Sequence, residues 1–246
     1  MLPVLTRADL TSPHDHLETL RLCGGYYLSP EGSDALLVGY AGTYEDNDGV
    51  KRQLVGKTYY NWAKCEENPD ILEHLGSLLA DRVRMSDVGG NVDVVLGAPM
   101  GGIATAYCLA LYLGVRFGFV EKEVTKVKTS DSREETKLVI SRHDVFSGDH
   151  VLVVEDVCNN FSTTDKMIQL IADRGATMVG VACLTNRSMG VKLPPVPIIG
   201  LMEIPTAQWR QDDPEVADLI AAGRIVPKPK NDWARLMEVN AAGRTT

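Results

Sequence analysis

The sequence LVVEDVCNNFSTT, residues 152–164, decides the predicted fold of this chain. An apolar run, which we expect to form a buried strand over 150–154, leads directly into the adjacent carboxylates of Glu155 and Asp156. After a short polar turn, the segment 163–174 has the apolar spacing of an amphipathic helix. Open α/β sheets bind ligands beyond the carboxyl ends of their strands, and the free N–H groups of a helix N-terminus suit a phosphate. The turn between strand and helix is therefore a predicted phosphate site.

The alternation of strands and helices extends through most of the chain. The pattern predicts strands near 93–97, 115–120, 137–141, 150–154, 178–184 and 197–201, and helices near 69–85, 102–113 and 163–174. Such an order is typical of the α/β class, with a mostly parallel, twisted sheet flanked by helices and joined by right-handed crossovers. We expect a single domain over 1–246, in which a core of about 66–190 carries a small hood built from the two chain ends, 1–65 and 191–246.

Two segments outside this core have patterns of their own. The turn signal EDNDG at 45–49 lies between residues that favour strands, which predicts a hairpin within 30–54. The tail from Gln208 is predicted to be helical and polar. We expect both segments to belong to the hood and to pack over the edge of the sheet that binds ligand.

Composition and charge limit the classes of function. The chain has 246 residues, of which 44% are hydrophobic and 24% charged, as is ordinary for a globular protein. Its net charge of −8 argues against a nucleic-acid partner, because nucleic-acid-binding surfaces need clustered Lys and Arg. The first residues lack the apolar core of a signal peptide and no apolar run is long enough to cross a membrane, so we expect a cytoplasmic protein without a membrane partner.

Cysteines and histidines give no sign of a metal centre. The five cysteines form no C-x-x-C pair and leave an odd one, which argues against both a zinc site and a disulfide framework. Cys158 stands beside the acidic pair, and we interpret it as a tolerated small residue of the turn because no histidine lies near it in sequence. The histidines show no metal spacing, so we assign no protein ligand to a metal.

The stretch 152–164 resembles the loop that binds phosphoribosyl pyrophosphate (PRPP) in type I phosphoribosyltransferases. In that family an acidic pair contacts the ribose hydroxyls and a Thr- and Gly-rich turn wraps the 5′-phosphate. Glu155 and Asp156 fall on the acidic pair, and the phosphate turn corresponds to Asn159, Asn160, Phe161, Ser162, Thr163 and Thr164.

The phosphate turn departs from the family pattern at one point. The family usually has one or two glycines where this chain has Phe161 and Ser162. Glycine takes positive φ at no steric cost, whereas an ordinary residue there loses about 1–2 kcal/mol. Asn tolerates that conformation better, so we expect Asn159 and Asn160 to compensate in part.

Other segments are similar to the orotate phosphoribosyltransferase branch. Residues 93–123 look like its strand, pyrophosphate loop, helix and second strand, and the resemblance implies that Met100, Gly101, Gly102 and Lys122 contact pyrophosphate. Residues 56–72 and 25–29 are similar to its segments before the core, whereas 30–54 looks like an insertion. Arg187, in CLTNR, matches an arginine that contacts the carboxylate of the base.

The resemblance implies that the protein transfers a phosphoribosyl group from PRPP to a nitrogenous base, orotate or an orotate-like pyrimidine, and releases pyrophosphate. Mg²⁺ would be the cofactor, carried largely by substrate and waters. Glu155, Asp156 and Lys126 would be the catalytic residues, the last from a mobile loop over 121–135. Related enzymes complete each site with a lysine from the neighbouring subunit, which implies a homodimer.

Each assignment has an alternative of a purely structural kind. The acidic pair could cap a turn, the glycines could serve a tight turn, the lysines could lie in a solvated loop, and Arg187 could form a surface ion pair. For the whole protein, the alternatives are a regulator that binds PRPP or a nucleotide without turnover, motivated by the missing glycines, and a phosphoribosyltransferase for another base.

Overall fold

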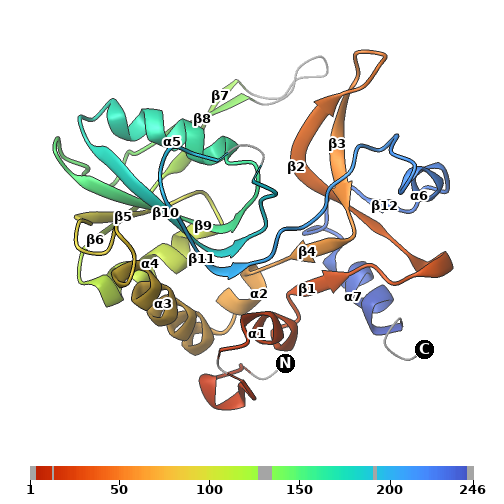
Figure 1. Ribbon diagram of the computed structural model, residues 1–246, viewed down its shortest axis with the longest axis horizontal. Coiled ribbons are helices and arrows are strands. Elements are labelled where there is room, and N and C mark those ends of the chain that lie inside the picture. Colours follow the sequence, from red (N-terminus) through yellow and green to blue (C-terminus); the bar gives the residue numbers. More distant parts are fainter. Residues whose placement is uncertain (1–3, 13, 127–134, 191–192, 243–246) are drawn as a thin grey trace. The chain divides into compact units, whose positions relative to one another are not determined.

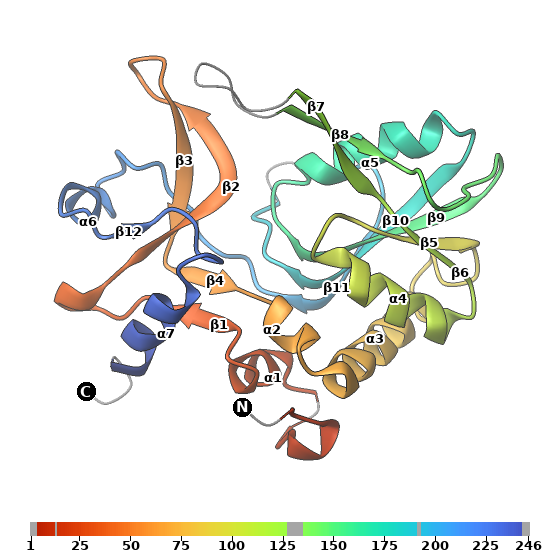
Figure 2. The same cartoon turned by 180° about the vertical axis from the view of Figure 1, so that it is seen from behind.

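The computed structural model describes residues 4–12, 14–126, 135–190 and 193–242 (Figures 1 and 2). The chain divides into two compact units, one of Met1–His16 and Cys65–Ile204 and the other of Leu17–Lys64 and Pro205–Thr246. The predicted core, 66–190, lies within the first unit. A hood over the ligand edge stays a prediction.

The first unit is built on a five-stranded sheet in the order β11-β10-β9-β5-β6, and every pairing in it is parallel. Its strands are β5 (Val94–Gly97), β6 (Arg116–Phe119), β9 (His150–Cys158), β10 (Thr177–Asn186) and β11 (Ile198–Glu203). Val and Leu fill most of β5 and the first part of β9, and the middle of β10 is likewise apolar, as expected for strands buried on both faces. The predicted α/β class with a parallel sheet is confirmed.

Helices cover both faces of this sheet. As Figures 1 and 2 show, α3 (Pro69–Arg84) and α4 (Gly102–Leu113) pack on one face and α5 (Ser162–Ala172) on the other. Helix α3 begins with Pro at its first turn, where no N–H is needed, and α4 ends at Gly114 with a φ of 73°. The apolar face of α5, with Met167 and Ile171, is buried with Val153 and Val181 of the sheet. Short helical turns lie at Arg7–Asp9, α1 (His16–Leu22) and α2 (Ala63–Glu66).

The segment expected to be a mobile loop begins and ends as strands. β7 (Glu121–Lys126) and β8 (Glu135–Val139) pair antiparallel as a ribbon separate from the main sheet, while residues 127–134 lie outside the described part of the chain. The strand near 137–141, predicted to lie in the parallel sheet, is β8 of this ribbon, so that prediction is wrong. Residues 136 and 137 of β8 are exposed and residues 138 and 139 are half-buried, so this strand lacks the continuous apolar character that burial between two helix layers requires.

The second unit holds the predicted hairpin. β2 (Leu37–Glu45) and β3 (Lys51–Gly56) pair antiparallel, β12 (Ile225–Val226) joins β2, and β1 (Tyr26–Leu28) pairs with β4 (Thr58–Tyr60). Asp46 closes the hairpin turn, since its Oδ1 accepts the N–H groups of Asp48 at 3.0 Å and Val50 at 2.8 Å. A 3-10 turn lies at Gly32–Asp34.

The tail after Gln208 is less uniform than predicted. It contains α6 (Ala217–Ala221), β12 and α7 (Trp233–Ala242), and it supplies Trp233 and Leu236 to the buried cluster around Tyr27. The expectation of a polar, helical tail was therefore only partly correct. Among the described residues, no helix combines the length and apolar content needed to cross a membrane.

Candidate active site at the carboxyl edge of the sheet

The two central strands end at different levels. β5 ends at Gly97, opposite Val154, whereas β9 continues to Cys158 with β10 as its partner on the other side. The strand was predicted to end at 154, so the acidic pair lies inside β9 and not after it. The sequence pattern does not predict a strand at these two positions because Glu and Asp disfavour strands. In the structure, pairing with β10 overrides that preference. Since successive side chains of a strand point to opposite faces, Glu155 and Asp156 lie on different sides of β9.

The glycine turn before α4 fits against this exposed part of β9. The Ala98 N–H donates to the Val154 carbonyl oxygen at 2.8 Å. A Cβ atom on Gly101 would overlap the Asp156 carboxylate, and one on Gly102 would overlap the Val154 carbonyl. Close approach to the backbone thus requires glycine at position 102, whereas at position 101 the neighbouring atoms belong to a side chain. The structure brings the predicted pyrophosphate turn into contact with the predicted ribose-binding carboxylate.

Hydrogen bonds within this turn bear on the predicted anion contacts. The Gly102 N–H, expected to contact pyrophosphate, donates to the Ala98 carbonyl oxygen at 3.1 Å. Met100 is 79% exposed, and the peptide bond between Pro99 and Met100 is cis. On β9, Asp156 Oδ1 accepts the N–H of Val157 at 2.9 Å.

The phosphate turn adopts the left-handed conformation at an unexpected residue. Phe161 has a φ of 55° and a ψ of 17°, and it is the one non-glycine residue of the described chain with positive φ. The expectation that Asn159 and Asn160 would take this conformation was therefore wrong. The sequence shows that the turn lacks the usual glycine, but it does not show which residue adopts the left-handed conformation instead.

Helix α5 starts directly after Phe161. The Asn160 Oδ1 accepts the Ser162 N–H at 3.3 Å, and the Phe161 carbonyl oxygen accepts the Asp165 N–H at 2.8 Å. The Ser162 side chain is exposed, Thr163 is half-buried and Thr164 is buried. The first turn of a helix carries N–H groups without intrahelical acceptors, so the start of α5 has the geometry expected of an anion site.

Arg187 lies at the same edge of the sheet. It follows β10 directly, and its N–H donates to the Cys158 carbonyl oxygen at 2.9 Å, beside the start of the phosphate turn. The residue is 4% exposed, so a surface ion pair is excluded. Its side chain has interactions of its own, but the Nε and Nη2 atoms are buried without a hydrogen-bond partner among the described residues. A buried guanidinium at the ligand edge of a sheet is suited to an anionic ligand.

The ribbon leaves the sheet near the glycine turn. Just before β7, the Val120 N–H donates to the Gly97 carbonyl oxygen at 3.0 Å. Lys122 is exposed on β7 opposite Leu138. The backbone of Lys126 ends β7, and its side chain lies outside the described residues. The predicted roles of both lysines stay predictions.

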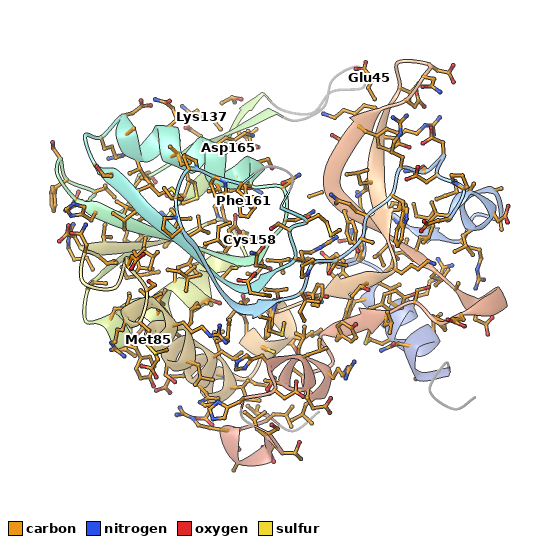
Figure 3. All side chains as sticks on the ribbon, viewed as in Figure 1. Glu45, Met85, Lys137, Cys158, Phe161 and Asp165 are labelled. Atoms are coloured by element: carbon orange, nitrogen blue, oxygen red, sulfur yellow. The ribbon has the colours of Figure 1, made fainter. Side chains whose placement is uncertain are left out.

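The environment of Cys158 argues against a nucleophile. Figure 3 labels its side chain together with Phe161, and the residue is 3% exposed. A hydrogen bond with the Cys183 thiol and burial both raise the pKa of the Cys158 thiol well above its ordinary value. A thiol held protonated is a poor nucleophile.

The described residues contain no cluster of three or more His, Cys, Asp or Glu side chains suited to a metal ion. Mg²⁺ commonly uses only one or two carboxylates and completes its octahedron with substrate phosphates and water. The carboxylates of Glu155 and Asp156 at the sheet edge are donors of that kind, so the residues present fit a magnesium ion that arrives with its substrate.

Comparison with known proteins agrees with this geometry. A sequence model of the phosphoribosyl transferase domain matches residues 61–218. The chain is 33% identical to the orotate phosphoribosyltransferase of Caldanaerobacter subterraneus over 54% of this chain, but it spans only 63% of that relative. It is 32% identical to that of Carboxydothermus hydrogenoformans, over 72% of this chain and 84% of the relative.

Two solved structures share the fold. Orotate phosphoribosyltransferase from Aeropyrum pernix is 19% identical, with a TM-score of 0.50, over 76% of this chain and 92% of that one. Adenine phosphoribosyltransferase from Trypanosoma brucei is 15% identical, with a TM-score of 0.51, over 77% of this chain and 79% of that one.

Proposed function

We propose that this chain transfers a phosphoribosyl group from PRPP to a nitrogenous base and releases pyrophosphate. The proposal starts from the fact that the chain belongs to the phosphoribosyl transferase domain family. The acceptor we propose is orotate or an orotate-like pyrimidine, since the curated relatives described above are orotate phosphoribosyltransferases. One observation carries the proposal: the acidic pair, the glycine turn, the start of α5 and Arg187 all lie at the carboxyl edge of a single sheet.

The reaction displaces pyrophosphate from C1 of the ribose by a nitrogen of the base. Positive charge develops on the sugar as negative charge leaves with the pyrophosphate, so the protein acts by positioning and charge stabilisation. Glu155 and Asp156 would accept hydrogen bonds from the ribose hydroxyls and steady the cationic sugar. The N–H groups of Thr163 and Thr164 would hold the 5′-phosphate at the start of α5.

The pyrophosphate would bind at the glycine turn. Since the Gly102 N–H donates to Ala98 in this structure, its use by pyrophosphate requires the turn to rearrange on binding. Lys122 and Lys126 of the ribbon would add positive charge near the leaving group. Mg²⁺, the proposed cofactor, would neutralise pyrophosphate charge when bound.

The base would bind near Arg187. Orotate carries a carboxylate, and a guanidinium can hold a carboxylate through two parallel hydrogen bonds. The burial of the Arg187 guanidinium at this edge of the sheet supports an acceptor with an anionic group over a base without one. An acceptor other than orotate remains the alternative, and a panel of bases tests it.

We also propose that the protein is a cytoplasmic homodimer. Met100, Tyr107 and Leu111 are exposed at 79%, 57% and 58%, and the last two stand one turn apart on α4. Large apolar side chains gathered on one exposed helix face are typical of a protein contact.

The decisive experiment measures pyrophosphate release with PRPP, Mg²⁺ and a panel of bases. We expect release with orotate, and strongly reduced PRPP affinity in the double variant Glu155→Gln, Asp156→Asn, because hydrogen bonds to charged groups contribute about 1.5–3 kcal/mol each. Tight PRPP binding without release for any base would favour the regulator. Unchanged PRPP affinity in the folded double variant would contradict the ribose assignment.

A further inference from the structure

The side chain at the left-handed position of the phosphate turn is large and buried. Phe161 is 4% exposed and belongs to a buried cluster that includes Met167 and Ile171 of α5. Figure 3 labels Phe161, which directly precedes this helix. A glycine would allow the same backbone conformation at no steric cost, but it would leave the turn free to adopt others. At Phe161, burial of the ring holds the backbone in one conformation.

The same cluster reaches the other parts of the site. It contains Ala98, the first residue of the pyrophosphate turn, together with Val120, which precedes β7, and Ile140, which follows β8. The residues that join the ribbon to the rest of the unit, and one residue from each anion-binding turn, are therefore packed into one core.

We propose that Phe161 is a positioning residue, whose buried ring fixes the N–H groups of Thr163 and Thr164 for the phosphate of a ribose 5-phosphate group. This inference rests on the proposed function. A turn ordered before binding loses less conformational entropy when the ligand arrives, so the ring strengthens binding without touching the ligand. It acts on the 5′-phosphate, which stays bound throughout the reaction, and hence on ground state and transition state alike.

The test compares three variants by calorimetry with ribose 5-phosphate and by steady-state kinetics with PRPP. Phe161→Gly keeps the backbone conformation accessible and removes the anchor. It is expected to raise the Kd for ribose 5-phosphate and the KM for PRPP about tenfold, with kcat changed less than about threefold. Phe161→Leu keeps a shorter apolar anchor and is expected to raise both the Kd for ribose 5-phosphate and the KM for PRPP about threefold.

The matched control is Ile171→Ala, in the same cluster and near the far end of α5. It should lower stability without moving the phosphate turn, so its Kd is expected to stay within about twofold of the parent protein. A loss of affinity equal to that of Phe161→Gly would mean that general destabilisation is the cause, and would overturn the inference.

Unchanged affinity in folded Phe161→Gly would also overturn it. Should that variant fail to fold, the affinity of Phe161→Leu is the test, and unchanged affinity in Phe161→Leu would likewise overturn the inference. If the parent protein binds neither ribose 5-phosphate nor PRPP, the proposed function fails and the inference fails with it. If the parent protein binds these ligands and Phe161→Gly binds them with the same affinity, only the inference is defeated.

Discussion

Two opposing free energies meet at Phe161. The left-handed backbone costs about 1–2 kcal/mol for a residue with a Cβ atom, while full burial of a phenylalanine side chain contributes about 1.5–3 kcal/mol. With a φ of 55° and 4% exposure, the residue has both effects at once. Burial outweighs strain, which explains how a turn without glycine keeps a conformation that glycine would favour.

Replacing the ring in two ways separates these effects. Phe161→Gly and Phe161→Ala both lose the buried ring, at a cost of about 3–5 kcal/mol. Only the alanine keeps the strain, so we expect the glycine variant to be more stable by about 1 kcal/mol. That order reverses the one found at ordinary positions, where glycine is the less stable. Urea denaturation measures both, and an alanine variant equal to or above the glycine one would show that the turn is not strained.

A second residue-scale prediction concerns His16. Burial, with a smaller effect of the Arg82 charge, lowers the pKa of His16 from 6.5 to about 4, and its Nδ1 is buried with no hydrogen-bond partner in the described part of the chain. The unfolded chain therefore takes up a proton at His16 near pH 6.5, which the folded chain does not bind until about pH 4. The folded state should lose stability from this residue as pH falls through that window, by about 1–2 kcal/mol once the partial exposure of the ring is taken into account.

The measurement is the unfolding free energy at pH 7 and pH 4.5 in the parent protein and in His16→Gln. The variant lacks the titrating group, so its decrease in stability between the two values should be smaller. Equal decreases in the two proteins would show that His16 does not contribute.

Among the elements, the contact between the start of α4 and β9 defines the site. The two glycines at this contact meet different atoms. Gly102 faces the backbone carbonyl of Val154, which is held by the Ala98 N–H, whereas Gly101 faces the side-chain carboxylate of Asp156. A backbone atom in a central strand cannot move away, but a carboxylate can rotate.

We therefore expect opposite outcomes from two similar substitutions. Gly102→Ala should destabilise the fold by about 3 kcal/mol or more, because it forces α4 away from the sheet. Gly101→Ala should cost stability only about 1 kcal/mol but weaken PRPP binding, because it turns Asp156 out of place. Thermal unfolding and PRPP titration measure the two effects. Intact PRPP affinity in Gly101→Ala would place the ribose contact elsewhere.

Elements with strong local signals were predictable from the sequence. Helices α3 and α4 and strands β5 and β6 lie within one residue or so of their predicted ranges, because apolar spacing and the flanking Pro69 and Gly114 mark them. The extra length of β9 and the β7–β8 ribbon were not predictable. Both depend on a partner strand that overrides local polarity. The left-handed conformation of Phe161 was not predictable either, because it depends on burial of the ring in the folded protein.

For the molecule as a whole, the outer face of α4 is the feature that links surface to function. Tyr107 and Leu111 are exposed there, and α4 begins at the glycine turn of the site. A subunit contact on this face would place the neighbour close to the proposed pyrophosphate site. The proposed dimer and the proposed sharing of a ribbon lysine across it are thus one structural hypothesis.

Leu111→Glu tests this hypothesis. A buried, unpaired carboxylate is costly at an apolar contact, so the variant should sediment as a monomer where the parent protein is a dimer. If a lysine of the neighbour's ribbon acts on the leaving pyrophosphate, the monomer should lose turnover by tenfold or more while PRPP affinity changes less. The control is Met85→Glu, an 81% exposed position at the end of α3 that Figure 3 labels, which should leave both assembly and turnover unchanged. A fully active Leu111→Glu monomer would show that each site is complete within one chain, and a parent protein that is itself monomeric would defeat the dimer.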